Sequence, residues 1–118
     1  NDIMTLPQEA SPSSTQAWVR AHKTNGRIVA WGREQGQGKI VMQFRSPPHI
    51  GTDCWFSDGN AESKSRLPMD EWIHVVHTYV PGDAKMYVNG KLDSGPPVRS
   101  GPLAIKTPSY FRVGGHRD

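Results

Sequence analysis

Residues that disfavour helices interrupt this chain so often that a long helix has little room to form. The 118 residues include 12 Gly and 10 Pro, and both residue types favour turns over helix interiors. Between these interruptions apolar and polar residues alternate with a period of two. The alternation is clearest in residues 39–44, where Ile40, Met42 and Phe44 share one face. The pattern predicts short strands joined by many loops.

The expected strands follow one another with no helical segment between them. Such an order indicates an antiparallel sandwich or barrel, and the length fits a single domain over residues 1–118. Asn25-Gly26 and Asn89-Gly90 are hairpin signals, so the strands flanking each pair are candidates for hairpins. After a short extended start at Ile3–Leu6, we expect strands at 16–21, 27–31, 39–44, 52–57, 61–67, 72–80, 84–88, 91–92, 103–106 and 110–113.

Charge, hydropathy and cysteine content exclude several classes of protein. The net charge is +3 and the basic residues are scattered, so we expect no nucleic-acid partner. No apolar run approaches the roughly 18 residues of a membrane span, so we expect no membrane insertion. Cys54 is the single cysteine, which excludes an internal disulfide and a cysteine-based zinc site. We expect its side chain to pack in the core and not to act as a reactive thiol.

Several of these segments resemble one known family. Residues 72–79, with the sequence WIHVVHTY, and residues 86–90, MYVNG, are similar to the "W-x-H-V-A-x-T-Y … L-Y-V-N-G" centre of laminin-G-like, concanavalin A-like lectin/glucanase domains. Weaker similarities, in the same order along the chain, lie at 16–19 (QAWV), 27–32 (RIVAWG) and 111–115 (FRVGG).

The resemblance implies an all-β fold, a two-sheet antiparallel β-sandwich of the jelly-roll type with a concave face. It also implies extracellular use and the binding of a glycan or an extracellular protein. Domains of the family usually carry further strands at both termini. The resemblance therefore implies one of two alternatives: this chain is a trimmed core that lacks terminal strands of the full domain, or another segment or chain completes its sheets.

The family pattern also suggests which face of the strand at 72–80 is buried. Its recurrent tryptophan suggests that Trp72 packs inside, and Trp18 is assigned to the core in the same way. Side chains alternate along a strand, so His77 and Tyr79 then lie on the opposite face. If that face is the concave one, both residues meet the ligand.

The loop at 47–60 carries the residue types that suit a sugar. Aromatic rings stack on the C–H faces of sugars, while planar polar groups bind the hydroxyls. Trp55 and Phe56 are neighbours on a strand, so one of them must point inward. The candidate ligand-binding residues are His49, Asp53, Trp55, Phe56, Asn60, His77 and Tyr79.

Calcium is a secondary expectation, because Asp53, Asp58 and Asn60 offer hard oxygen ligands but match no calcium-loop signature. His74 and His77 point to opposite faces of a strand, so we expect no shared zinc site. No two of the four glutamates, Glu9, Glu34, Glu62 and Glu71, form an E-x-D-x-x-E motif, and retaining glycosidases need a close carboxylate pair. We therefore expect no enzyme activity.

These observations favour a non-catalytic carbohydrate-binding, lectin-like module of an extracellular protein. The first alternative is an extracellular protein-interaction or structural module. The second is an accessory fragment of a glycosidase whose catalytic residues lie outside this chain.

Overall fold

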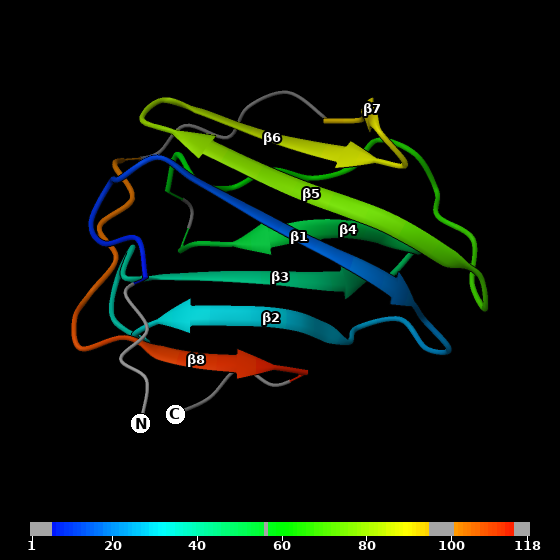
Figure 1. The fold of residues 1–118 in the computed structure, drawn as a ribbon, viewed down its shortest axis with the longest axis horizontal. Coiled ribbons are helices and arrows are strands. Elements are labelled where there is room, and N and C mark those ends of the chain that lie inside the picture. Colours follow the sequence, from blue (N-terminus) through cyan, green and yellow to red (C-terminus); the bar gives the residue numbers. More distant parts are fainter. Residues whose placement is uncertain (1–5, 56, 95–100, 115–118) are drawn as a thin grey trace.

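Two antiparallel sheets stack to form a β-sandwich (Figure 1). The computed structural model describes residues 6–55, 57–94 and 101–114. The predicted extended start at Ile3–Leu6 lies almost wholly outside these residues. Within them, no helix is long and apolar enough to cross a membrane. The predicted all-β jelly-roll sandwich is confirmed.

Each sheet has four strands. One sheet has the order β1-β5-β6-β7 and the other the order β4-β3-β2-β8. The strands are β1 (Ser13–Arg20), β2 (Arg27–Gly32), β3 (Lys39–Arg45), β4 (His49–Asp53), β5 (Trp72–Val80), β6 (Asp83–Val88), β7 (Lys91–Leu92) and β8 (Tyr110–Val113).

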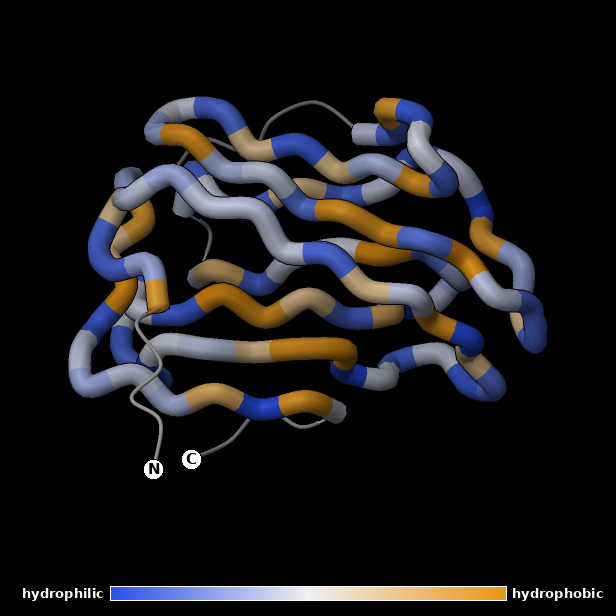
Figure 2. The backbone as a smooth tube through the Cα atoms, viewed as in Figure 1, coloured by the Kyte–Doolittle hydropathy of each residue, from blue (hydrophilic) through white to orange (hydrophobic). Residues whose placement is uncertain are grey.

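The core lies between the sheets and is built from alternate residues of facing strands. The predicted alternation in β3 is confirmed, because Ile40, Met42 and Phe44 are all buried in one apolar cluster. Ile73 and Met86 of the other sheet belong to the same cluster. Apolar and polar residues alternate along the strands that supply these side chains (Figure 2), as expected when one face of each sheet is covered.

The predicted burial of Trp72 and Trp18 is wrong. Trp72 is 64% exposed and Trp18 is 66% exposed, whereas Ile73 of the same strand is 2% exposed. The period-two alternation of β5 is real, but the aliphatic face meets the other sheet and the tryptophan face points outward. A shift of one residue in such a pattern moves every side chain to the opposite face.

His77 and Tyr79 therefore lie on the inner face of β5 and not on a ligand-facing surface. Both are buried, at 0% and 1% exposure. The prediction that they meet a ligand is wrong, and the reason is the same inversion of the two faces of β5.

The hairpin signals had different outcomes. Asn89 and Gly90 both have positive φ, 49° and 79°, and they join β6 to β7 as the expected two-residue turn. Asn25-Gly26 joins β1 to β2, but these strands lie in opposite sheets. The Gly26 carbonyl accepts from the Phe44 N–H of β3 at 2.7 Å, so the turn leads into the second sheet.

Other predicted segments also differ from the structure. β4 begins at His49, inside the segment expected to be a loop, and pairs with β3 directly after residues 46–48. Residues 61–67 and 103–106 make isolated bridges instead of strands. Their partners are Gly51 and Ser94 for the first segment and Glu9 for the second.

One edge of the sandwich is incompletely covered. β1 and β8 are the last strands of their sheets. β8 lies beyond β1 in the view of Figure 1, so no strand of the described residues covers its inward side chains. Phe111 and Val113, which pair with the buried Trp31 and Val29, are 41% and 78% exposed.

Because Ile73 faces the core and Trp72 faces outward, substitutions at these adjacent residues should change the stability by very different amounts. Ile73→Ala should lower the free energy of unfolding by about 2–5 kcal/mol, since it leaves a cavity in the core. Trp72→Ala should change it by less than about 1 kcal/mol, since the ring is mainly in solvent. Urea denaturation of both variants checks this, and a larger loss for Trp72→Ala than for Ile73→Ala would contradict the assigned faces.

Candidate functional site

A hollow of about 820 Å³ lies on the outer face of the β4-β3-β2-β8 sheet. Its position follows from the alternation in β3. Because Ile40, Met42 and Phe44 face the core, the residues between and beside them face outward. The side chains around the hollow are Asn25, Glu34, Lys39, Gln43, Arg45, Ser46, Asp53, Trp55, Asn60 and Glu62.

Several outward-facing residues near the middle of this face are buried. Ala30, Val41 and Asp53 lie side by side across three strands, and Gln43 lies beside Gly51. A Cβ atom added at Gly51 would lie 3.1 Å from Glu62 Cγ. Glycine therefore lets the Glu62 side chain lie directly over β4, while longer side chains rise at both ends of the hollow.

One end of the hollow is a compact group of charges around Lys39. This lysine is only 6% exposed. Its ammonium lies 2.8 Å from Glu34 Oε1 and 3.5 Å from Asp53 Oδ2. A nearly buried ammonium needs such partners because its desolvation is costly. The group has one cation and two carboxylates, so this end of the hollow carries a net negative charge.

The ring of Trp55 stands beside this group. Lys39 Nζ lies 5.4 Å from the Trp55 ring centroid, and Trp55 is 42% exposed. The backbone of Trp55 has φ = 55°, a left-handed conformation that is unfavourable for a bulky residue. Asp53 Oδ1 accepts from the Trp55 N–H at 3.3 Å and Gln37 Nε2 donates to the Trp55 carbonyl at 3.4 Å. These bonds stabilise the unfavourable backbone conformation from which the exposed ring projects.

The other end of the hollow is formed by Arg45 and Glu62, whose charged atoms are 3.3 Å apart. His49 Nε2 lies 3.9 Å from the second carboxylate oxygen of Glu62. His49 Nδ1 lies 2.6 Å from the Pro47 carbonyl oxygen, so Nδ1 is the donor there. His49 thus lies beside Glu62 but does not line the hollow.

The loop below Trp55 is fixed by side chains that were predicted to bind ligands or calcium. The Asp58 carboxylate accepts from the Tyr79 hydroxyl at 2.9 Å, the Gly82 N–H at 2.8 Å and the Leu103 N–H at 2.9 Å. Its oxygens therefore join three separate segments of the chain.

Asn60 has a similar structural role. Its Oδ1 accepts from the Cys54 N–H at 3.2 Å and its Nδ2 donates to the Thr52 carbonyl at 2.9 Å. The three predicted calcium ligands Asp53, Asp58 and Asn60 are thus engaged with different protein partners. Among the described residues, no group of three or more His, Cys, Asp or Glu side chains is arranged to hold a metal ion.

The buried groups under this loop have strongly shifted pKa values. The expected burial of Cys54 is confirmed, and this burial raises the pKa of its thiol to about 12. Burial and the bond to Asp58 raise the pKa of Tyr79 well above its ordinary value. Burial lowers the pKa of His77 to about 4, although its bond to the Gly59 carbonyl acts in the opposite direction.

The structure thus brings together some predicted ligand-binding residues and separates others. Asp53, Trp55 and Asn60 line the hollow. His49 lies beside Glu62, and His77 and Tyr79 are in the core. Phe56 lies outside the described residues. Sequence reasoning missed several lining side chains, although the polar face of residues 39–45 was a signal for three of them. The missed residues are Asn25, Glu34, Lys39, Gln43, Arg45, Ser46 and Glu62.

Comparisons with known proteins agree with this architecture. A family model described as "Concanavalin A-like lectin/glucanases superfamily" matches residues 3–118. Among solved structures, domains LG4-5 of the mouse laminin alpha1 chain superpose with a TM-score of 0.66 at 17% sequence identity. The match covers 95% of this chain and 30% of that structure. A search of curated proteins found no match.

The buried His77 predicts a specific dependence of stability on pH. Its Nε2 donates to the Gly59 carbonyl at 2.9 Å and its Nδ1 is buried without a partner in the described residues. Since the folded pKa is lowered from 6.5 to about 4, the unfolded chain binds the proton first. The stabilisation is complete above pH 6.5 and is lost as the pH falls towards 4, by at most about 1.4 kcal/mol per pH unit.

Urea denaturation at a series of pH values between about 6.5 and 5 measures this slope. His77→Gln should make the slope shallower, and His74→Gln, on the opposite face of β5, serves as the control and should keep the original slope. Equal slopes for the original protein and His77→Gln would contradict the assignment.

Proposed function

This chain belongs to the concanavalin A-like lectin/glucanase superfamily, and on that premise we propose that it is a non-catalytic, carbohydrate-binding module of an extracellular protein. The fold supports a glycan- or protein-binding role in general. The choice of a glycan rests on the hollow over β3 and β4.

One observation carries this proposal: the exposed Trp55 ring stands beside the ion-paired group of Lys39, Glu34 and Asp53. A sugar ring lying on Trp55 would place its C–H face on the indole. Its hydroxyls would then reach the two carboxylates, which accept hydrogen bonds, and the ammonium, which donates them.

The preorganisation of these groups supports binding in particular. Two carboxylates hold the Lys39 ammonium. Hydrogen bonds with the Asp53 and Gln37 side chains hold the Trp55 backbone. A ligand therefore does not have to order the Lys39 side chain or the Trp55 backbone when it binds, which lowers the entropic cost of binding. Glu34 and Asp53 both contact the same ammonium, and we assign them to recognition instead of acid–base chemistry.

A second candidate function, a protein-interaction module, is favoured by the outer face of the other sheet. Trp18 and Trp72 are both more than half exposed there, on neighbouring strands. The Trp18 and His74 rings are 5.0 Å apart with an angle of 35° between their planes. Exposed tryptophans are enriched in the energetically dominant parts of protein interfaces.

The two surfaces separate the two functions experimentally, because each carries an exposed tryptophan. Trp55→Ala should weaken glycan binding about tenfold, equivalent to about 1.4 kcal/mol, since it removes the stacking surface. Trp18→Ala, on the opposite side of the sandwich, is the matched control and should leave glycan affinity unchanged. A glycan array identifies the ligand, and calorimetric titration then measures the affinity of both variants.

The outcome that contradicts the glycan proposal is a flat response across the array. Equal losses for Trp55→Ala and Trp18→Ala would also contradict the location of the site. Loss of a protein partner on Trp18→Ala, with no glycan response from the unmodified protein, would favour the second candidate.

A further inference from the structure

The hollow beside Trp55 has a charge opposite in sign to that of the whole chain. The chain has a net charge of +3, whereas two cations and three carboxylates line the hollow and give it a net charge of −1. The cations belong to Lys39 and Arg45, and the carboxylates belong to Glu34, Asp53 and Glu62. A further cation of this face, Arg112, lies opposite Ala30 on β8 and does not line the hollow.

The positive charge of Lys39 is compensated before any ligand binds. Its ammonium contacts the carboxylates of Glu34 and Asp53. The Lys39 side chain is only 7% exposed, whereas those of Glu34 and Asp53 are 39% and 37% exposed. The third N–H of the ammonium can still donate to a hydroxyl, but an incoming anion would meet more negative than positive charge at this end.

Arg45, at the other end of the hollow, is engaged in the same way. Its Nη1 lies 3.3 Å from Glu62 Oε1. With the Gln43 amide turned so that its oxygen faces the guanidinium, this oxygen accepts from Arg45 Nε at 3.2 Å and from Nη2 at 3.0 Å. All three guanidinium nitrogens therefore have partners within the protein. The paired donors that usually bind a carboxylate or a phosphate are already in use.

The groups that remain accessible to a ligand are mainly hydrogen-bond acceptors and one aromatic face. The side chains of Glu34, Asp53 and Glu62 are more than a third exposed, and the Trp55 ring is exposed beside the first two. Carboxylates only accept hydrogen bonds, and an indole face attracts cations. A protonated amine suits both, because it donates up to three charge-assisted hydrogen bonds.

We propose that the hollow selects its glycan by charge and takes a sugar that carries a free, protonated amino group. This inference rests on the proposed glycan-binding function and names the class of sugar. The sugar ring stacks on Trp55, and its ammonium group binds on the side of Glu34 and Asp53. A second amino sugar along the same chain reaches Glu62. Sugars with a carboxylate or a sulfate are disfavoured, because the two cations of the hollow are already paired.

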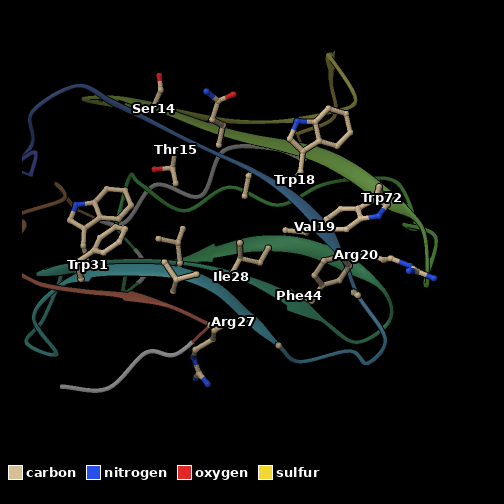
Figure 3. A pocket seen from close by; sticks show the side chains of 18 of the residues that line it. Ser14, Thr15, Trp18, Val19, Arg20, Arg27, Ile28, Trp31, Phe44 and Trp72 are labelled. Atoms are coloured by element: carbon tan, nitrogen blue, oxygen red, sulfur yellow. The ribbon is translucent and has the colours of Figure 1, made fainter.

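A lysine-rich protein segment offers the same ammonium group but fits less well, because a lysine side chain has no ring whose C–H face covers Trp55. The charge selection also separates the hollow from the concavity of about 770 Å³ between β1 and β2. The described lining of that concavity includes Arg20, Lys23 and Arg27 but no carboxylate (Figure 3). Binding is therefore assigned to the hollow only where Trp55→Ala weakens it.

The test compares oligosaccharides of equal length that differ in one substituent on each ring. Two series, of gluco- and galacto-configuration, carry an amine, a hydroxyl or a carboxylate. Calorimetric titration measures their affinities at about pH 6, where sugar amines are largely protonated and carboxylates are ionised. In at least one series the amine should bind roughly three- to tenfold more tightly than the hydroxyl, and the carboxylate should bind least tightly. Trp55→Ala should weaken the binding of the amine oligomer.

Three variants that remove one negative charge each test where the preference arises. Glu34→Gln and Glu62→Gln should reduce the preference for the amine about threefold and leave the affinity for the hydroxyl oligomer nearly unchanged. Glu71→Gln changes an exposed carboxylate outside the hollow. It is the matched control and should keep the original preference. Since Glu34 also binds Lys39, urea denaturation checks that Glu34→Gln remains folded, and Glu62→Gln supplies the test if it does not.

The proposal is overturned, with the glycan-binding function intact, if binding that depends on Trp55 shows no preference for the amine or favours the carboxylate. It is also overturned if no oligomer of either series binds, and the glycan array then decides separately on the proposed function. A lysine peptide that binds more tightly than the amine oligomer of equal charge would assign the hollow to a basic protein segment instead.

Discussion

The packing of the inner face of β5 against the inner face of β3 holds the two sheets together. This packing determines which face of each strand is buried and which is exposed. Ile73, Val75 and Tyr79 of one sheet share an apolar cluster with Ile40, Met42 and Phe44 of the other. Since side chains alternate on both strands, this contact turns Lys39 and Gln43 outward on one sheet and Trp18 and Trp72 outward on the other. The polar hollow and the exposed tryptophans are thus consequences of one buried interface.

The loop at 54–60 connects this core to the candidate site. Asp58, Asn60 and His77 use their polar atoms to fix the loop against β4, β5 and the segment around Leu103. The result is a rigid base from which Trp55 projects beside Lys39. Asp58, Asn60 and His77, which the sequence suggested as binding residues, therefore position Trp55, the residue that we assign to ligand binding. Such positioning favours preorganised binding.

Much of the fold could be predicted from local patterns, and the errors come from information that a local pattern does not contain. The β5-β6-β7 unit was predictable because its alternation, Pro81-Gly82 and Asn89-Gly90 are all local signals. The buried face of β5 was not, because alternation defines two faces but only the opposing sheet decides which is covered. The same limit hid Glu34 and Glu62, which reach the hollow from outside the strands that form its floor. Asp53 and Trp55 were predicted as ligand-binding residues because their residue types alone suggested sugar binding, and both line the hollow.

The central claim is that a ligand meets the outer face of β3 and β4 at Trp55. The most direct measurement is nuclear magnetic resonance of the tryptophan indole and backbone amide groups during titration with an oligosaccharide. The account predicts chemical-shift changes at the Trp55 indole and at the amides of Lys39, Gln43 and Asp53, with the Trp18 and Trp72 indoles unchanged. Changes confined to Trp18 and Trp72, with Trp55 unaffected by a ligand that binds, would contradict it.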